Sequence, residues 1–445
     1  MADVTNSVRQ SYPLLESALL SRNIAAGEQL AAGGAFDLKL KGASELGPLG
    51  FYETYRHRLG IEQPLYGGGS VFAGYRNGRG FFQPWYLERQ TNDGGEFKAG
   101  ITIPLFQNRR IDPRRAELWR TTYGRKRVEP EIQAQLIEFI VFGSFAYWDW
   151  VAAGRNVEIA ESLLKLATDR QKGLAELVKK GDREKIVLTD NERLIVSRQA
   201  KLTDARQKLQ QSAVKLSLFL RGQDGNPFIP PDSMLPKSFP NAERIDAAQL
   251  QQDIERALQN RPELQILALL QRQLNVDLAQ AKNLMQPSLN AVFSGSQDVG
   301  KPTSSKRDKS EFELESGLYL NVPIQRRKAR GKIQAVEGKL AQISIKRRFT
   351  RDKIVTDVQT AYAVLTAAYQ RIGQARRAYE LAKRMETAEW EYFKAGDSNL
   401  LEINIRESQT AAAAATLVDA LLRYFQARAA YRAALALEIV PGSEP

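Results

Sequence analysis

The chain of 445 residues contains no cysteine and a single histidine, His57. Without cysteine it cannot form a disulfide, a thiolate zinc site, an iron–sulfur cluster or a cysteine nucleophile. One histidine excludes a metal site built on several histidines and argues against a Ser–His triad. We therefore expect no metal and no cofactor.

Long apolar runs are also missing. None approaches the roughly 20 residues that a membrane-spanning helix needs, so we expect no helix to cross a bilayer. The alternating strands of a membrane β-barrel barely register in hydropathy, and a barrel stays open as an alternative. Met1–Gln10 is polar and contains no apolar targeting segment. The chain is therefore either cytosolic or a mature form whose signal peptide has been removed.

The chain contains an internal repeat. Each half contains a strand-like segment, a long helix, a Gly-Asp turn and a shorter helix, and the offset between the halves is 215 residues where Asp182 matches Asp397. The matching segments are Gly94–Arg110 with Ser310–Arg327, Ser144–Tyr147 with Gln359–Tyr362, and Val178–Asp182 with Phe393–Asp397. We infer that the chain arose by duplication.

The strand-like segments alternate with a period of two. Apolar residues recur at every second position of 97–103 and, except at Ser316, of 312–322, and mostly polar residues lie between them. Segment 36–41 alternates likewise, and 289–297 alternates more weakly. One interpretation is a half-buried sheet in a soluble α+β domain, which general frequency favours. The other is a membrane barrel with apolar side chains toward lipid.

Helices account for most of the rest. Arg114–Val178 and Arg330–Phe393 contain little proline, and each would form a helix of roughly 65 residues, about 97 Å long. Gly181 and Gly396 would end these helices in the left-handed conformation, and Asp182 and Asp397 would cap the returning helices. The predicted returning helices are 184–221 and 398–437, with further helices at 7–30 and at 247–285, the last of them broken at Pro262.

No catalytic motif is present. The glycine-rich run Gly67–Gly74 lacks the Lys-Ser/Thr pair of a phosphate loop and predicts a turn. The net charge is +13, from 64 basic and 51 acidic residues, and basic clusters recur where a strand meets a helix. The clusters are Arg109, Arg110, Arg114 and Arg115, then Arg326, Arg327, Lys328, Arg330 and Lys332. Contact with anionic lipid head groups at the inner leaflet and contact with nucleic acid are the two functional interpretations.

An ordered set of motifs covers nearly the whole chain. It consists of Tyr12-Pro13, Asn260–Leu264, Pro287–Leu289, Leu320–Ile324, Gly331–Ile333, Ala361-Tyr362 and Gly396. With this set the sequence resembles the TolC-like outer-membrane efflux protein family.

The resemblance implies a mainly α fold with a membrane β-barrel. Three subunits would share one 12-stranded barrel, each supplying four strands, and their helical hairpins would form a long periplasmic α-barrel. The homotrimer would be a passive, non-enzymatic exit duct of a tripartite efflux or type I secretion system in the outer membrane of a Gram-negative bacterium. Its partners would be a periplasmic adaptor (membrane fusion) protein, an inner-membrane transporter and outer-membrane lipid, without nucleic acid.

On this basis the chain divides into eight parts. They are an N-terminal periplasmic helix (1–33), a first barrel strand pair with a long loop (34–110), a first helical hairpin (111–221), a waist linker (222–250), a returning helix (251–286), a second strand pair (287–325), a second hairpin (326–440) and a tail (441–445). Strand-like pieces at 58–65 and 70–75 and the aromatic residues Trp85 and Tyr86 lie within 47–94, which is either an enlarged extracellular loop or extra strands.

The resemblance also assigns roles to residues. The hairpin tips that would contact the adaptor, unless they are helix caps alone, are Lys180, Gly181, Asp182, Ala395, Gly396 and Asp397. Glu402 and Asp190 would form the periplasmic aperture, although Glu402 stands where the family usually has Asp and Ile405 where a second acid would follow. The lipid-facing residues would be Phe97, Ile101, Ile103, Phe312, Leu314, Leu318 and Leu320. The basic clusters would form an inner-leaflet girdle.

Two alternatives stay open. One is a soluble helical scaffold that binds anionic membrane or nucleic acid through its basic faces, and the other is an enzyme built on helical hairpins. The exported substrate, the transporter class and the resting state of the channel do not follow from the sequence.

Overall fold

The computed structural model describes residues 1–445 except 84–89, 223, 305–307 and 438–445. Trp85 and Tyr86, the predicted tail and the last residues of the second hairpin therefore lie outside the described residues. The chain forms two units, each assembled from segments that are far apart in the sequence. The helical unit contains Met1–Leu20, Glu129–Gln265 and Arg348–Pro445, and the sheet unit contains Ser21–Val128 and Ile266–Arg347.

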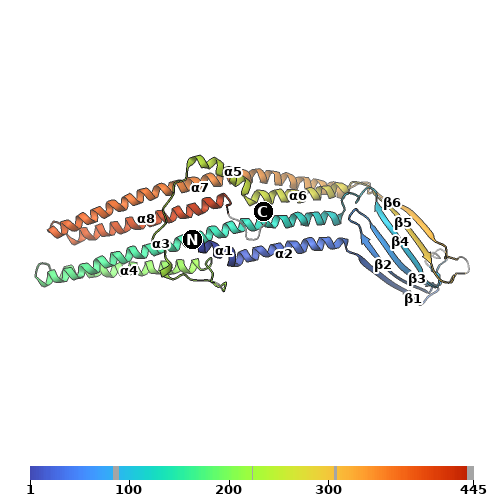
Figure 1. The fold of residues 1–445 in the computed structure, drawn as a ribbon, viewed down its shortest axis with the longest axis horizontal. Coiled ribbons are helices and arrows are strands. Elements are labelled where there is room, and N and C mark those ends of the chain that lie inside the picture. The colour runs from blue at the N-terminus through green and yellow to red at the C-terminus, as the bar shows by residue number, and fades with distance from the viewer. Residues whose placement is uncertain (84–89, 223, 305–307, 438–445) are drawn as a thin grey trace. The chain divides into compact units, whose positions relative to one another are not determined.

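The helices follow the predicted order (Figure 1). They are α1 (Ala2–Ser11), α2 (Pro13–Gly33), α3 (Pro113–Lys179), α4 (Ile186–Leu216), α5 (Leu250–Asn260), α6 (Pro262–Asn283), α7 (Arg327–Ala395) and α8 (Leu400–Ala434). Two of the boundaries fall at a residue that precedes proline. Tyr12 and Arg261 adopt extended backbone conformations, because the proline ring disfavours the helical conformation of the residue before it. The predicted break at Pro262 is confirmed.

The sheet unit contains one antiparallel sheet in which sequence neighbours are also spatial neighbours, in the order β1-β2-β3-β4-β5-β6 (Figure 1). The strands are β1 (Lys39–Gly47), β2 (Thr54–Pro64), β3 (Ser70–Gly80), β4 (Glu96–Pro104), β5 (Ser288–Asp298) and β6 (Glu313–Asn321). The pairing of β4 with β5 joins the two halves of the duplicated chain in one ladder, with Ile101 opposite Phe293.

The first half contributes four strands where the resemblance implies two. The expectation of four strands in each chain is therefore wrong, because the described sheet has six. The additional strands are β2 and β3, so the segment between 47 and 94 contains extra strands. β1 and β4 run in opposite directions, which means that β2 and β3 stand as a hairpin between two strands that could otherwise pair directly. Alternating residues at 58–65 and 70–75 were the sequence signal for this hairpin.

The first three residues of the glycine-rich run lie in the turn of that hairpin, as predicted, and the rest of the run belongs to β3. Gly68 and Gly69 have φ angles of +97° and +79°, which side chains of L-residues rarely adopt. A Cβ atom at Gly69 would also collide with the carbonyl oxygen of Thr102 in β4. Glycine is thus required here by the backbone, with no role for a phosphate.

The mainly aliphatic core of the helical unit contains a stack of aromatic rings. Trp148 of α3 stacks on Phe425 of α8 with ring centroids 4.2 Å apart, and Phe239 stacks on both rings. Phe239 belongs to the segment 222–250, which is therefore packed against the helices. The Tyr424 hydroxyl ties the same segment down, since it donates to the carbonyl oxygen of Glu243 (2.8 Å) and accepts from the Glu243 amide (2.9 Å).

One helix, α3, contains a window of 18 residues that is apolar enough to span a membrane by length and composition. The expectation that no helix has this length and composition is therefore wrong, because polar residues interrupt the apolar ones in this window and no long apolar run marks it. More than half of the window (56%) is buried inside the protein, and core helices of folded proteins pass the same test. This single helix is weak evidence for a span.

Tyr424→Phe is predicted to lower the free energy of unfolding by about 1 to 2 kcal/mol, because it leaves a backbone N–H and a carbonyl of the segment 222–250 without their partner. Chemical denaturation of the full-length protein, followed by circular dichroism, measures the effect. Tyr392→Phe is the matched control, since Tyr392 is 58% exposed. Equal stability of the two variants would contradict the role given to the Tyr424 hydroxyl.

Candidate functional site

One face of the sheet is apolar across all six strands. The register places Gly295 opposite both Ala99 and Leu314, and Ala291 opposite both Ile103 and Leu318. The predicted lipid-facing residues of β4 and β6 therefore share a face, and the Phe312 ring lies over Gly295 on that same face. Other members of this face, reached through the same ladders, are Leu40, Leu46, Leu59, Ile61, Val71, Leu289, Phe293 and Leu320.

These apolar side chains are largely uncovered by the chain. Leu40, Leu314 and Leu318 are 73%, 77% and 71% exposed. An exposed apolar surface that continues over six strands is much larger than the scattered apolar residues of ordinary protein surfaces, and such a patch indicates contact with lipid or with another protein.

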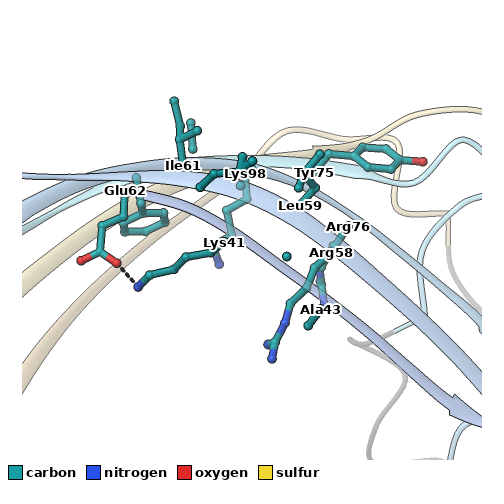
Figure 2. Close-up of a pocket in the computed structure, with 15 residues that line it drawn as sticks. Lys41, Ala43, Arg58, Leu59, Ile61, Glu62, Tyr75, Arg76 and Lys98 are labelled. Atoms are coloured by element: carbon teal, nitrogen blue, oxygen red, sulfur yellow. Dashed lines mark hydrogen bonds and ion pairs between the residues drawn. The ribbon is translucent and has the colours of Figure 1, made fainter. Parts of the chain in front are cut away.

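The opposite face of the sheet is charged. Its ionic side chains pair between neighbouring strands, as in Arg56 with Glu45 (2.8 Å), and Lys41 with Glu62. Further pairs on this face are Arg58–Glu45, Arg76–Glu96 and Lys98–Glu315. Figure 2 shows the part of this face over β1 to β4, where a hollow is lined by Lys41, Arg58, Glu62, Arg76 and Lys98. The sheet thus separates an apolar surface from a charged one on which acids and cations are paired.

The two predicted basic clusters lie where the sheet meets the helices. Arg109 and Arg110 are exposed in the loop between β4 and α3, and Arg326, Arg327 and Lys328 stand at the start of α7. The prediction is wrong for Arg115, which the sequence places in the first cluster. It is buried, and its guanidinium donates to the carbonyl oxygens of Asn108 (2.5 Å) and Arg109 (2.9 Å). Arg115 therefore holds the shape of the loop that presents Arg109 and Arg110.

Glycines shape both hairpin tips, as predicted. Gly181 (φ 86°) and Gly396 (φ 91°) are left-handed, and the amides of Asp182 and Asp397 return to the carbonyls of Leu177 (3.0 Å) and Tyr392 (2.9 Å). This bonding satisfies carbonyls that the helix end leaves free.

The predicted capping role of the two aspartates is wrong. Asn399 caps α8 by accepting from the amides of Leu401 (2.9 Å) and Glu402 (3.1 Å), and α4 has no side-chain cap. The physical reason is that the chain needs further residues after each aspartate before it can turn into the returning helix. Lys180 and Ala395 flank the glycines as predicted, and adaptor contact at the tips stays a prediction.

The proposed aperture acids are both exposed. Glu402 lies in the first turn of α8, and Asp190 in α4 forms an ion pair with Arg193 (3.1 Å) on the same helix. Neither is brought near the other by a contact within the described chain. Among the described residues, no group of three or more His, Asp or Glu side chains could hold a metal ion.

The structure reveals a buried acid that sequence reasoning missed. Glu407 of α8 has a fully buried side chain and accepts from Arg198 of α4 (2.7 Å) and from Arg170 of α3. Both guanidinium groups are at most 3% exposed, and that of Arg170 also lies 5.4 Å from the ring of Trp390 in α7. We call Glu407, Arg170 and Arg198 the buried clamp. It connects the hairpin α3–α4 to the hairpin α7–α8.

Burial has an electrostatic cost in the clamp. It lowers the pKa of the Arg198 guanidinium, while the hydrogen bond and the charge of Glu407 act in the opposite direction. The sequence signal for the clamp is periodicity: Glu407 falls on the same face of α8 as the buried residues Ile403 and Thr410. An acid on an otherwise buried stripe predicts a buried cationic partner.

Glu407→Ala is predicted to destabilise the protein by about 3 to 5 kcal/mol, because it leaves two buried guanidinium groups without a counter-charge. Thermal unfolding of the full-length protein measures the loss. Glu402→Ala is the control on the same helix, since the Glu402 side chain is exposed and has no ion pair in the described part of the chain. A similar shift for both variants would show that the clamp has no special weight.

No protein-family model matches the chain, and no curated protein matches its sequence. Solved structures do match. CusC, from a study of transmembrane channel formation, is 14% identical with a TM-score of 0.68, over 97% of this chain and 91% of CusC.

Two outer-membrane channels match similarly. MtrE of Neisseria gonorrhoeae is 14% identical with a TM-score of 0.68, over 97% of this chain and 88% of MtrE. CmeC of Campylobacter jejuni is 12% identical with a TM-score of 0.67, over 100% of this chain and 87% of CmeC. The resemblance to TolC-like proteins is therefore confirmed for the fold: over nearly its whole length, the chain has the fold of outer-membrane channel proteins.

Proposed function

We propose that the protein is a passive outer-membrane exit duct of a tripartite efflux or type I secretion system. The observation that carries this proposal is the two-faced sheet, whose apolar face is exposed and whose charged face is internally ion-paired. A bilayer covers such an apolar face, while the charged face lines a water-filled lumen. The fold shared with outer-membrane channels supports the same function.

The dimensions of the sheet suit a bilayer. Its strands have 9 to 11 residues, and a tilted transmembrane strand needs about 9 to 11. A sheet with open edges is unstable in hydrocarbon, because the unpaired backbone groups of its edge strands have no water to bond. Several copies must therefore close one barrel, and we propose a homotrimer, as in the family that the sequence resembles.

The proposed roles of the helices, the hairpin tips, the basic girdle and the two aperture acids follow from this arrangement. The helices would lie in the periplasm of a Gram-negative bacterium, with the tips at Gly181 and Gly396 against a periplasmic adaptor protein that connects to an inner-membrane transporter. The basic girdle would face anionic head groups of the inner leaflet, and Glu402 and Asp190 would each be repeated as a ring of three acids. Such rings favour cations in the passing solution.

A soluble scaffold that binds nucleic acid or membrane through its basic faces accounts less well for the structure. It offers no cover for the apolar face of the sheet, and the cations of the charged face are paired with acids of the same chain. We therefore retain the channel.

We predict that the full-length protein, exported in a Gram-negative host, will be recovered from the outer-membrane fraction. Because the apolar face has no cover in water, extraction will require detergent, and mass determination will give three chains per particle. A soluble monomer or dimer that needs no detergent would contradict the proposal.

Leu318→Arg is predicted to reduce the yield of outer-membrane trimer and to lower its stability by about 2 kcal/mol, because it places a charge on the face that contacts lipid. Unfolding in urea in the presence of lipid vesicles measures the change. Tyr319→Arg is the matched control, because Tyr319 is the next residue of β6 and points to the charged face. If both substitutions were equally costly, the assignment of the two faces would be wrong.

A further inference from the structure

The sheet ends in two open edges, and both belong to strands of equal length. Within the described residues, β1 pairs only with β2 and β6 pairs only with β5. Each of these edge strands has nine residues. In a membrane their free N–H and carbonyl groups must find partners, and a second copy of the chain offers the matching edge.

The directions of the two edge strands fit each other. β1 follows α2 and runs away from the helices, whereas β6 runs back toward the helices and leads into α7. Placed side by side in neighbouring copies, β1 and β6 are therefore antiparallel. Their side chains also alternate in step, since the even-numbered residues of both strands, such as Leu40 and Leu320, lie on the apolar face.

The sheet is strongly staggered. A line drawn across the strands from Lys39, the first residue of β1, passes through Glu62, Phe72, Gly100, Ser294 and Glu315. The helix-side end of β6 is Asn321, six residues beyond Glu315. Across its six strands the helix-side edge of the sheet therefore steps by six residues.

We propose that β1 pairs over its full length with β6 of the next copy, with Lys39 opposite Asn321, so that three copies close an eighteen-stranded barrel. This inference rests on the proposed channel function and replaces the 12-stranded barrel that the resemblance implies. Three steps of six residues give the closed barrel a stagger of eighteen, equal to its strand number. A barrel of eight strands with a stagger of eight has a tilt of about 36°, and the same ratio gives the same tilt here. Membrane barrels have tilts of about 35 to 45°.

Other registers fit less well. If β1 were shifted by two residues along β6 so that each copy contributed a step of four residues, the total stagger of the barrel would be twelve. The strands would then tilt by about 25°, below the range of membrane barrels. A shift in the opposite direction shortens the ladder from nine residue pairs to seven. The full-length register thus combines the longest ladder with an acceptable tilt.

The side chains brought together by this register are compatible. On the apolar face Leu40 lies opposite Leu320, and Leu46 lies opposite Leu314, so the lipid-facing surface continues from copy to copy. On the charged face Glu45 lies opposite Glu315. Each of these acids already has cations of its own, Glu45 from Arg56 and Arg58 and Glu315 from Lys98. The contact is therefore a pair of like charges, unfavourable by itself, that cations flank on both sides.

The hairpin of β2 and β3 is what widens the barrel. At a strand spacing of about 4.8 Å and a tilt of about 36°, eighteen strands enclose a barrel about 34 Å across between backbones, against about 23 Å for twelve strands. The wider ring leaves room for a hydrated lumen lined by the charged face.

Disulfide cross-linking tests the register directly, because the chain has no native cysteine. Ser44→Cys combined with Ser316→Cys places two thiols directly opposite each other between copies, at a Cβ separation of about 4.5 to 5.5 Å. Oxidation in outer membranes is expected to yield covalent species of up to three chains on a non-reducing gel. The matched control, Ser44→Cys with Leu320→Cys, moves one thiol four residues along the strand, about 14 Å away, and should give none.

A second pair of cysteines is tested as well, because replacing Ser44 also removes its hydrogen bond with His57 (3.0 Å) and disturbs the sheet locally. Ala43→Cys with Gly317→Cys lies opposite in the same register, on the charged face. An outer-membrane trimer in which neither designed pair forms a disulfide, or in which the control pair forms it instead, would overturn the eighteen-stranded barrel while leaving the channel function intact. Absence of an outer-membrane trimer would overturn both.

Discussion

The structure depends on one constraint, the pairing of every backbone N–H and carbonyl group in a sheet that has an apolar face. Within the chain the ladders from β1 to β6 satisfy this constraint, with registers that keep apolar and charged residues on separate faces. In the part of the chain that the structure describes, the outer edges of β1 and β6 alone remain open. Under the proposed function, the need to pair these edges in hydrocarbon requires several copies, and the stagger of the sheet determines how many strands they enclose.

The long helices of the two halves are stabilised by lateral packing. Helices of 67 and 69 residues, α3 and α7, are stable only through lateral packing, because an isolated helix gains little in water. In the helical unit this packing combines the aromatic stack around Trp148 with the buried clamp at Glu407. The clamp is a specific contact, since one carboxylate satisfies two arginines on two helices of the other hairpin. Aromatic packing buries surface area, and the clamp adds buried ion pairs between the two hairpins.

Local patterns predicted most elements, because each depends on neighbours in the sequence. The period-two alternation of 97–103 and 312–322 predicted β4 and β6, the Gly-Asp turns predicted the ends of α3 and α7, and Pro262 predicted the break after α5. The features that were left open or predicted wrongly depend on residues that are distant in the sequence. Alternation at 58–65 and 70–75 left loop and strand equally open, since only pairing with β1 and β4 makes those segments strands. Asp182 and Asp397 resemble caps, yet the turn geometry gives that role to Asn399 in one hairpin and to no side chain in the other.

The sequence by itself determined the duplication, the positions of the long helices, the two-sided character of the strands and the lack of cysteine and of histidine clusters. These properties follow from composition and from periods of two and 3.6 residues, which are local. Tertiary structure alone decided that the sheet has six strands, that its register staggers by six residues, and that Glu407 is the acid buried between two arginines. Each of these depends on which distant segments become neighbours, and that choice is made by the free energy of the whole packed chain rather than by any single segment.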